Sequence, residues 1–391
     1  MMLSIGILTH STNPRGGVVH GMALAEALCD AGHEVTLIAP DATGAGFFRT
    51  PRCATRCIPA KPVAELPALV ERRIEEIAEA LRDDGRFDVL HAQDPISSNA
   101  LADLATEGRI PGFARTVHHL DRFSHPGVAA RQRRGVTAAT ELFTVSQMWR
   151  DTLLAEYGRE APVVGNGVDL EKFSSEPVLR DHDVRECYGL PQDARLILSI
   201  GGVERRKNTL VLLEAFEILH RENPSLHLVI VGGATLLDHS DYRRFFDERV
   251  RTTGLADAVT VTGVVADDDI PAFYRQSSVL AYPSQTEGFG LCPLEALACG
   301  IPAVTPAAPP FTEHLHSLEA FWCLPDRPET LVCALREALS ARSPARFQVS
   351  GPATARRFDW RSVANRHLPA YRRLAALSRA SVLAQELHNH A

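Results

Sequence analysis

Residues 195–233, RLILSIGGVERRKNTLVLLEAFEILHRENPSLHLVIVGG, decide the fold class of this chain. The segment begins with an apolar strand expected over 195–202 and continues with a helix expected over 209–223. A second apolar strand follows over 227–233. A strand, a helix and a strand in this order are typical of a parallel sheet that is covered by helices.

The same alternation extends in both directions from this segment. Further strands are expected at 3–10, 34–40, 87–93, 113–119 and 141–146, and at 259–265, 278–284 and 301–306. The polar stretch 174–193 lacks periodicity and separates the two series, so it is the predicted linker. A chain of 391 residues is also long enough for two domains. We therefore predict an α/β protein with two doubly wound, Rossmann-like domains, 1–175 and 190–352.

A helical tail, 353–391, is expected to pack back on the N-terminal domain, with Pro369 kinking or breaking its helix. From Arg336 onwards the chain carries a net charge of +7, which leaves −14 for the remainder. This asymmetry favours a basic tail that folds onto the acidic body over the alternative of peripheral contact with an anionic membrane.

Composition excludes several classes of protein. A hydrophobic content of 45% and a charged content of 23% are those of a globular domain, and the net charge of −7 argues against a general nucleic-acid binder. The eight scattered cysteines indicate free thiols of a reducing compartment, and Cys53 and Cys57 lack the second ligand pair of a zinc site. The N-terminal MMLSIGILTH lacks the features of a signal peptide, so a cytoplasmic protein is expected.

Ligands of such sheets bind at the carboxyl ends of the strands, which singles out four loops. In the first, the glycine pair at 16–17 suits an anion at a helix N-terminus, although a tight turn alone would also use it. In the second, His118 and His119 face opposite ways, so one is expected in the site, and the pattern does not choose between them. Packing of a histidine against the core is the alternative.

The other two loops carry charge. Arg205, Arg206 and Lys207 form a cationic cluster that suits a phosphate, with a solvated surface as the alternative. Glu287 is expected on a strand-to-helix turn and Glu295 in the first turn of the following helix, with Gly288 and Gly290 between them. Two carboxylates beside phosphate-binding amides suit a nucleotide sugar, although either acid could simply stabilise the helix end. The paired acids of a glycosidase are disfavoured by the phosphate-suited turn between them.

Six stretches carry a resemblance to a known family: 14–35 (PRGGVVHGMALAEALCDAGHEV), 116–121 (TVHHLD), 145–149 (VSQMW), 166–173 (NGVDLEKF), 201–208 (GGVERRKN) and 287–304 (EGFGLCPLEALACGIPAV). The chain resembles the retaining GT-B glycosyltransferases of the group that includes glycogen synthases, sucrose synthases and bacterial mannosyltransferases, which is family 4-like. The most specific match is the Glu-x7-Glu signature of Glu287 and Glu295. The subgroup that it resembles is a less characterised bacterial one.

The resemblance implies a hexosyltransferase whose two domains face an interdomain cleft. Such an enzyme moves a sugar from a nucleoside diphosphate sugar to a hydroxyl acceptor with retained anomeric configuration, and it needs no cofactor. No Asp-x-Asp metal motif lies at these strand ends, so metal independence is predicted. A sugar phosphorylase of the same fold and a non-catalytic nucleotide-sugar-binding protein remain the alternatives. A dehydrogenase is disfavoured because no Gly-x-Gly-x-x-Gly follows the first strand.

The resemblance also implies residue roles. Glu287 and His118 would act at the transferred sugar, Glu295 would hold the ribose, and Lys207 with Arg206 would hold the diphosphate. The remaining donor-binding candidates are Gly17, Gly288, Phe289, Gly290 and Leu291, and the acceptor-binding candidates are Asn13, Asp94 and His119. One position departs from the family pattern, because Gly202 stands where the phosphate-binding arginine is usual. Arg206 or Arg205 would have to replace it.

Overall fold

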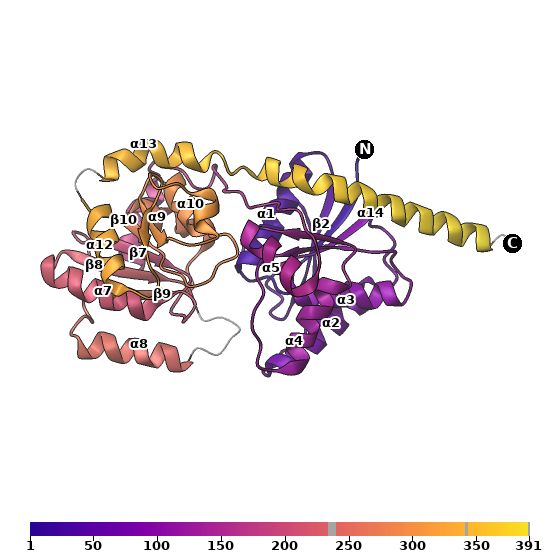
Figure 1. Ribbon diagram of the computed structural model, residues 1–391, viewed down its shortest axis with the longest axis horizontal. Helices are drawn as coiled ribbons and strands as arrows, with labels where there is room; N and C mark the ends of the chain where they lie inside the picture. The colour runs from indigo at the N-terminus through magenta and orange to yellow at the C-terminus, as the bar shows by residue number, and fades with distance from the viewer. Residues whose placement is uncertain (234–239, 341–342, 390–391) are drawn as a thin grey trace. The chain divides into compact units, whose positions relative to one another are not determined.

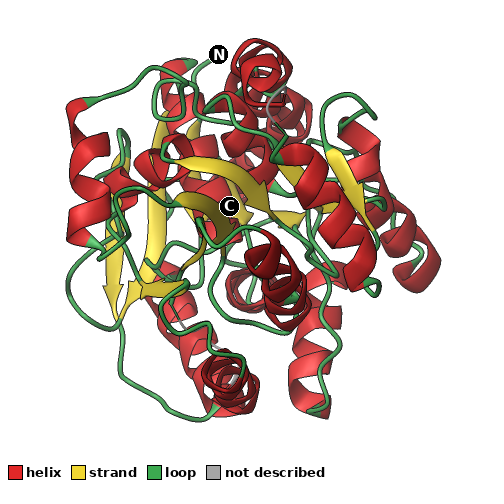
Figure 2. Ribbon diagram, turned by 90° about the vertical axis from the view of Figure 1, so that its left-hand side faces the viewer, coloured by secondary structure: helices red, strands yellow, loops and turns green. Residues whose placement is uncertain are grey.

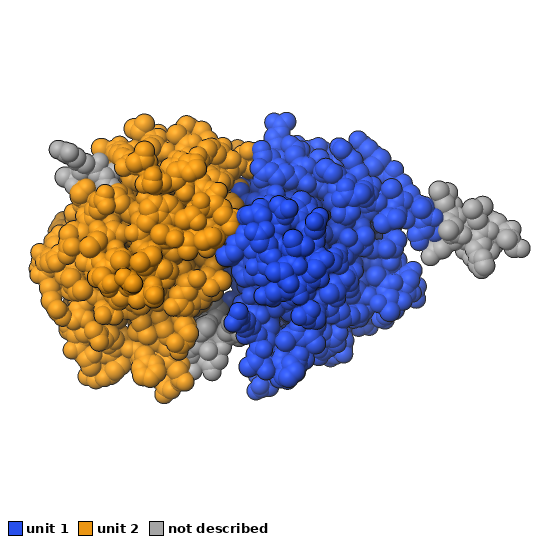
Figure 3. All heavy atoms as spheres, viewed as in Figure 1, with its two compact units in different colours: residues 1–166, 360–391 blue, residues 167–359 orange. Residues whose placement is uncertain are grey.

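The computed structural model describes residues 1–233, 240–340 and 343–389, which belong to two compact units (Figure 3). Unit 1 comprises residues 1–166 and 360–391, and unit 2 comprises residues 167–359. Each unit contains one six-stranded parallel sheet, with helices packed on both of its faces (Figures 1 and 2). The predicted α/β class with two Rossmann-like domains is confirmed.

The sheet of unit 1 has the strand order β3-β2-β1-β4-β5-β6. Its strands are β1 (Ser4–Leu8), β2 (Glu34–Asp41), β3 (Ala54–Pro59), β4 (Val89–Ala92), β5 (Ala114–Val117) and β6 (Glu141–Thr144). Its helices are α1 (Gly16–Asp30), α2 (Leu66–Leu81), α3 (Pro95–Thr106), α4 (Pro126–Thr137), α5 (Gln147–Tyr157) and α14 (Trp360–Asn389). Successive strand residues face opposite sides, so Leu37 joins a core with α1 and α14 while Ile38 joins a core with α2 and α3.

The sheet of unit 2 has the order β12-β11-β10-β7-β8-β9. Its strands are β7 (Arg195–Ile200), β8 (Leu226–Val231), β9 (Val259–Gly263), β10 (Ser277–Ala281), β11 (Ala303–Pro306) and β12 (Phe321–Cys323). Its helices are α6 (Asp183–Cys187), α7 (Thr209–Glu222), α8 (Ser240–Thr252), α9 (Ile270–Arg275), α10 (Leu291–Ala298), α11 (Phe311–His314), α12 (Pro328–Ala338) and α13 (Ser343–Ala355), with 3-10 turns at Leu179–His182 and Asp267–Asp269. Leu212 and Phe216 of α7 pack with α12 on one face of this sheet.

Both sheets reverse their strand order beside the first strand of the unit. In unit 1 the reversal lies between β1 and β4, and in unit 2 it lies between β7 and β10. The connections that leave the two strands at such a point run to opposite faces of the sheet, so their loops open a crevice at the carboxyl ends. The loops after β7 and β10 carry the predicted cationic cluster and the first glutamate.

The structure differs from the sequence predictions at several edges. The edge strands β3 and β12 were not predicted, because β3 is polar and largely exposed and β12 has three residues. Gly16 and Gly17 form the first turn of α1 instead of a loop before it. Of the kink or break predicted at Pro369, the break does not occur, because α14 continues through this residue from Trp360 to Asn389.

The chain segment 167–189 packs on unit 2, so the predicted boundary near residues 175–190 falls inside that unit. Arg275 of α9 donates to both carboxylate oxygens of Asp181 at 2.7 Å and to the carbonyl of Ser174 at 3.2 Å. Arg185 of α6 donates to the Gln276 side chain at 3.0 Å. These contacts tie the connecting segment to α9.

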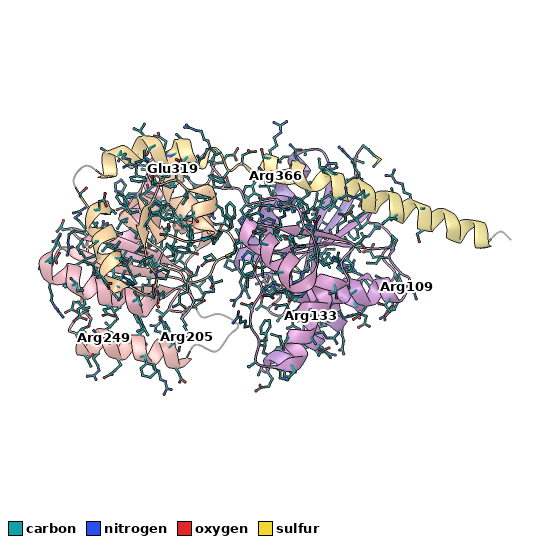
Figure 4. The ribbon with its side chains drawn as sticks, in the orientation of Figure 1. Arg109, Arg133, Arg205, Arg249, Glu319 and Arg366 are labelled. Carbon is teal, nitrogen blue, oxygen red and sulfur yellow. The ribbon has the colours of Figure 1, made fainter. Side chains whose placement is uncertain are left out.

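Helix α14 packs on the face of the unit 1 sheet that α1 also covers, where Tyr371 and Leu374 share a core with Ile5 and Met22. Arg366, labelled in Figure 4, donates from Nη1 to the carbonyl of Val164 at 2.6 Å. Within the described residues, every helix is too short or too polar to span a bilayer.

Candidate functional site

Glu287, in the loop between β10 and α10, is the centre of a polar cluster in unit 2. Its Oε1 accepts hydrogen bonds from four donors: Lys207 Nζ at 2.7 Å, Arg206 Nη1 at 2.7 Å, Ser284 Oγ at 2.7 Å and the Tyr282 hydroxyl at 2.9 Å. The Lys207 ammonium also lies 4.4 Å from the centroid of the Tyr282 ring. Residues that lie 80 positions apart in the sequence therefore meet at the switch point of the sheet.

The charges of this cluster keep the Glu287 carboxyl ionised. Burial alone would raise its pKa, but the ammonium of Lys207 and the guanidinium of Arg206 outweigh burial and lower the pKa to about 2. Burial also raises the pKa of Tyr282 well above its ordinary value, so its phenol remains a donor. At neutral pH Glu287 is consequently a hydrogen-bond acceptor and has no proton to give.

Two glycines after β7 occupy positions where a Cβ would not fit, and the first of them leaves the space that Lys207 needs. Gly201 has φ of +121°, and a Cβ at this position would lie 2.4 Å from Lys207 Cε. Gly202 has φ of +75°, and a Cβ there would lie 2.7 Å from the carbonyl oxygen of Gly233. A side chain at residue 202 would thus collide with the backbone in this conformation.

Of the two arginines offered as substitutes, Arg206 reaches the cluster. Its guanidinium bonds Glu287 and also lies 3.3 Å from the Thr286 carbonyl oxygen. Arg205 instead lies with its guanidinium 5.3 Å from the centroid of the Tyr242 ring (Figure 4 labels Arg205). The geometry therefore favours Arg206 as the second cation beside Lys207.

The glycine-rich turn at Gly288–Gly290 leads directly into α10. Gly290 has φ of +92° and precedes the first helical residue, Leu291, and a Cβ on it would lie 2.4 Å from Phe311 Cε1. The Phe289 ring stacks on His314 with a centroid distance of 4.3 Å, so this side chain is held in the core. The first backbone N–H groups of a helix lack intrahelical acceptors and favour an anion.

Glu295 occupies a different environment from Glu287. It lies in the second turn of α10, not the first turn as predicted, and its Oε2 accepts a hydrogen bond from the Tyr274 hydroxyl at 2.6 Å. Burial raises the pKa of Glu295, and the Tyr274 hydrogen bond and Lys172 lower it by less. Two carboxyl groups of one signature thus have pKa values shifted in opposite directions.

The structure distinguishes the two histidines of unit 1. His118 is half-buried, with Nε2 at 3.0 Å from Gln93 Oε1 and its ring edge-on to His20 at 4.6 Å between centroids. His119 is exposed and lies with Nε2 at 3.1 Å from the Asp121 carboxylate. Gly17 belongs to the His118 surroundings, because a Cβ on it would lie 3.4 Å from His118 Cδ2.

The candidate acceptor residues have varied surroundings. Asp94 is the N-cap of α3, where its carboxylate accepts hydrogen bonds from the backbone and the hydroxyl of Ser97 at 2.8 Å each. His10 Nδ1 lies 3.7 Å from the same carboxylate. Asn13 is exposed, and its carbonyl accepts from the backbone N–H of Arg15 at 2.8 Å.

Sequence reasoning missed several side chains around these groups. Tyr282 and Ser284 follow β10 two residues apart and therefore point the same way, a period-2 signal that could have found them. Tyr274, Gln93 and His20 gave no local signal, because their contacts depend on how distant elements pack.

Comparison with known proteins places this geometry in a family. Residues 14–172 match the family described as Glycosyltransferase Family 4, and residues 182–351 match the one described as Glycosyl transferases group 1. The chain belongs to the GT-B glycosyltransferases that combine these two domains.

Two relatives are D-inositol 3-phosphate glycosyltransferases. The one from Paenarthrobacter aurescens is 29% identical over 62% of this chain and 62% of its own length, and the one from Xylanimonas cellulosilytica is 32% identical over 59% and 58%. The match thus spans about three-fifths of these relatives.

Two solved structures share the fold. Sucrose-phosphate synthase from Thermosynechococcus elongatus has a TM-score of 0.78 at 20% identity, covering 96% of this chain and 99% of the other. HepE from Anabaena in complex with UDP and glucose has a TM-score of 0.78 at 18% identity, with coverage of 94% and 99%.

The charge cluster predicts a pH-dependent contribution to stability. Because the pKa of Glu287 falls from 4.5 to about 2 on folding, ionised Glu287 stabilises the protein fully above about pH 4.5. This contribution, about 3 kcal/mol at about 1.4 kcal/mol per pKa unit, is lost as the pH falls towards 2. We expect Glu287→Gln to lower the free energy of unfolding at neutral pH, with a gap from wild type that narrows below pH 4.5 in denaturant titrations. A gap that is independent of pH would contradict the assignment.

Gly201→Ala should displace the Lys207 side chain and destabilise the protein by more than Gly254→Ala. Gly254 also has a positive φ, +71°, but no atom lies within 4 Å of a Cβ there, so its variant carries backbone strain alone. Free energies of unfolding measured for the two variants compare the effects, and equal losses would show that Lys207 does not need the space beside Gly201.

Proposed function

We propose that this protein transfers a hexose from a nucleoside diphosphate sugar to a hydroxyl acceptor, with retention of the anomeric configuration and without a divalent metal ion. The observation that carries the proposal is the cluster of Lys207, Arg206 and Glu287 at the switch point of unit 2, beside the N-terminus of α10. Cations, helix amides and an ionised carboxylate are the groups that a diphosphate and a sugar require.

The arrangement suits a diphosphate for electrostatic reasons. The Lys207 ammonium is largely buried and already held by Glu287 and Tyr282, so it needs little reorganisation to meet a phosphate oxygen. Arg206 offers a planar second cation, and the N–H groups at the start of α10 offer neutral donors. Glu287 and Glu295 would accept hydrogen bonds from hydroxyl groups of the sugar and the ribose, respectively.

The proposed reaction proceeds on one face of the sugar. The bond from the anomeric carbon to the diphosphate oxygen breaks, and the acceptor oxygen bonds to the same face through an oxocarbenium-like state. The departing diphosphate takes the acceptor hydroxyl proton, and Lys207 and Arg206 stabilise its charge. Because its pKa is about 2, Glu287 would serve as a hydrogen-bond acceptor in this step and not as the acid.

The names of similar proteins suggest where to begin with substrates. The inositol phosphate in the names of the relatives makes a polyol phosphate the first acceptor to test, and the UDP-glucose bound by HepE makes UDP-glucose the first donor. A phosphorylase would instead need free phosphate and no nucleotide, and a non-catalytic binder would hold the donor without turnover.

A dinucleotide-dependent enzyme is disfavoured by the end of β2. An acidic residue there holds the ribose in dinucleotide-binding sheets. Here the carboxylate of Asp41 accepts hydrogen bonds from the backbone N–H groups of Thr43 and Gly44 at 2.9 Å and of Gly46 at 2.8 Å. The carboxylate of Asp41 is thus already hydrogen-bonded to the backbone of the loop that follows β2, which disfavours its use for binding a ribose.

Replacing the central cation should remove donor turnover. We expect Lys207→Met to lower kcat/KM for the donor selected from a nucleotide-sugar panel by about 10²-fold or more, because one charge opposite the leaving group is lost. Lys61→Met, an exposed lysine of unit 1, is the matched control and should leave turnover unchanged. Wild-type rates in Lys207→Met would place the donor site elsewhere.

The stereochemistry and metal requirement are open to a direct assay. We expect the product to keep the anomeric configuration of the donor in proton NMR spectra recorded during turnover, and the rate to be unchanged by excess chelator. An inverted product would exclude the proposed same-face reaction, and loss of rate that added Mg²⁺ or Mn²⁺ restores would show that the cations of the protein do not suffice.

A further inference from the structure

We propose that Gln93 is a positioning residue that holds the His118 imidazole in the tautomer protonated at Nε2 and so presents the Nδ1 lone pair to a substrate hydroxyl. This inference rests on the proposed function for the identity of the substrate. The tautomer itself is a property of the ligand-free protein and does not depend on that function.

The contact between the two side chains has a single chemical sense. Gln93 follows β4, its backbone N–H donates to the carbonyl of Leu8 at 2.9 Å, and it is 2% exposed. Its Oε1 lies 3.0 Å from His118 Nε2. An amide oxygen only accepts hydrogen bonds, so His118 Nε2 must carry the proton when the Gln93 amide is oriented in this way.

The His91 ring fixes the orientation of the Gln93 amide. Gln93 Nε2 lies 3.4 Å from both His91 Nδ1 and His91 Nε2. If the amide nitrogen lay in the plane of the His91 ring at 3.4 Å from both ring nitrogens, it would collide with Cε1, which lies between them. The amide nitrogen must therefore lie over the face of the ring. An N–H group is favourable over the negative face of an aromatic ring, whereas a carbonyl oxygen is repelled. The amide oxygen is therefore the atom that faces His118.

His91 is itself held by two further buried groups. Its Nδ1 lies 2.6 Å from the Tyr371 hydroxyl, and its Nε2 lies 2.9 Å from Thr116 Oγ1. Burial raises the pKa of Tyr371 well above its usual value, so its O–H remains and is able to donate to Nδ1. A chain of buried polar contacts thus runs inside unit 1 from Tyr371 of α14 through His91 and Gln93 to His118.

The consequence for His118 is a neutral ring with one lone pair to offer. Burial lowers its pKa well below the ordinary value, and the titratable neighbours His20, His119, His91 and Arg115 lower it further. Within the described residues, His118 Nδ1 makes no hydrogen bond, and it is not among the fully buried polar atoms without a partner. The Nδ1 atom is therefore accessible to a hydroxyl donor. A neutral ring also suits the proposed reaction, because a protonated ring would repel the positive charge that develops at the sugar.

Nitrogen-15 NMR of the histidine side chains in the ligand-free protein tests the tautomer. We expect His118 of the wild type to be neutral and protonated at Nε2 at about pH 6. Gln93→Met should give a mixture of tautomers, and Gln93→Glu should give an imidazolium, because a carboxylate raises the pKa of its partner. Gln147→Glu, on α5 at the surface, is the matched control and should leave His118 unchanged. A wild-type ring protonated at Nδ1, or a tautomer that Gln93→Met leaves unchanged, would overturn the proposal.

Kinetics on the same variants separate positioning from packing. We expect Gln93→Glu to lower kcat by about 10-fold or more at pH 6. The kcat of this variant should recover as the pH rises and His118 loses its second proton. Gln93→Met should lose kcat at all pH values, and Tyr371→Phe should show a smaller loss in the same sense. Equal losses at every pH in Gln93→Glu would indicate a merely structural role. If the wild type turns over no donor, the proposed function fails while the NMR result still decides the tautomer.

Discussion

The contact between the buried Lys207 ammonium and the Glu287 carboxylate is the interaction on which the site of unit 2 depends. Burying either charge alone would cost desolvation free energy, and the attraction between the two charges offsets this cost. The pair forms because β7 and β10 are neighbours in the sheet while the chain leaves them towards opposite faces. Gly201 leaves the space for Lys207, and the Tyr282 hydroxyl and Arg206 donate to Glu287, so these groups hold the pair at the end of the sheet.

The two units have the same kind of strand order but place groups of different charge at the ends of their strands. Unit 2 gathers charges, and its Glu287 stays ionised at a pKa of about 2. Unit 1 gathers neutral rings at the corresponding strand ends, where burial lowers the pKa of His20 to about 4 and that of His118 well below its usual range. A set of fixed charges suits a diphosphate, and a set of neutral hydrogen-bonding groups suits hydroxyl groups and a developing positive centre.

The two sheets and the strand-end positions of Lys207 and Glu287 could be predicted from the sequence, because strand periodicity and strand-end motifs are local signals. The alternation of strands and helices gave the two sheets, and the motifs placed Lys207 and Glu287 at strand ends that the topology brings together. The edges β3 and β12 were not predictable, since β3 buries little and β12 is three residues long. The different surroundings of Arg205 and Arg206, and of His118 and His119, depend on side-chain packing and therefore could not be predicted. The proposed role of Gln93 could not be predicted for the same reason. It depends on the ring of His91 in β4, which is in turn hydrogen-bonded to Tyr371 of α14.

The most direct test of the central claim is a crystal structure of the protein with a bound nucleoside diphosphate sugar. The account predicts that Lys207 Nζ and the Arg206 guanidinium lie within hydrogen-bonding distance of diphosphate oxygens, with the phosphates at the start of α10 and a sugar hydroxyl donating to Glu287. A diphosphate bound at another edge of the chain, with Lys207 and Glu287 still bonded only within their own cluster, would contradict it.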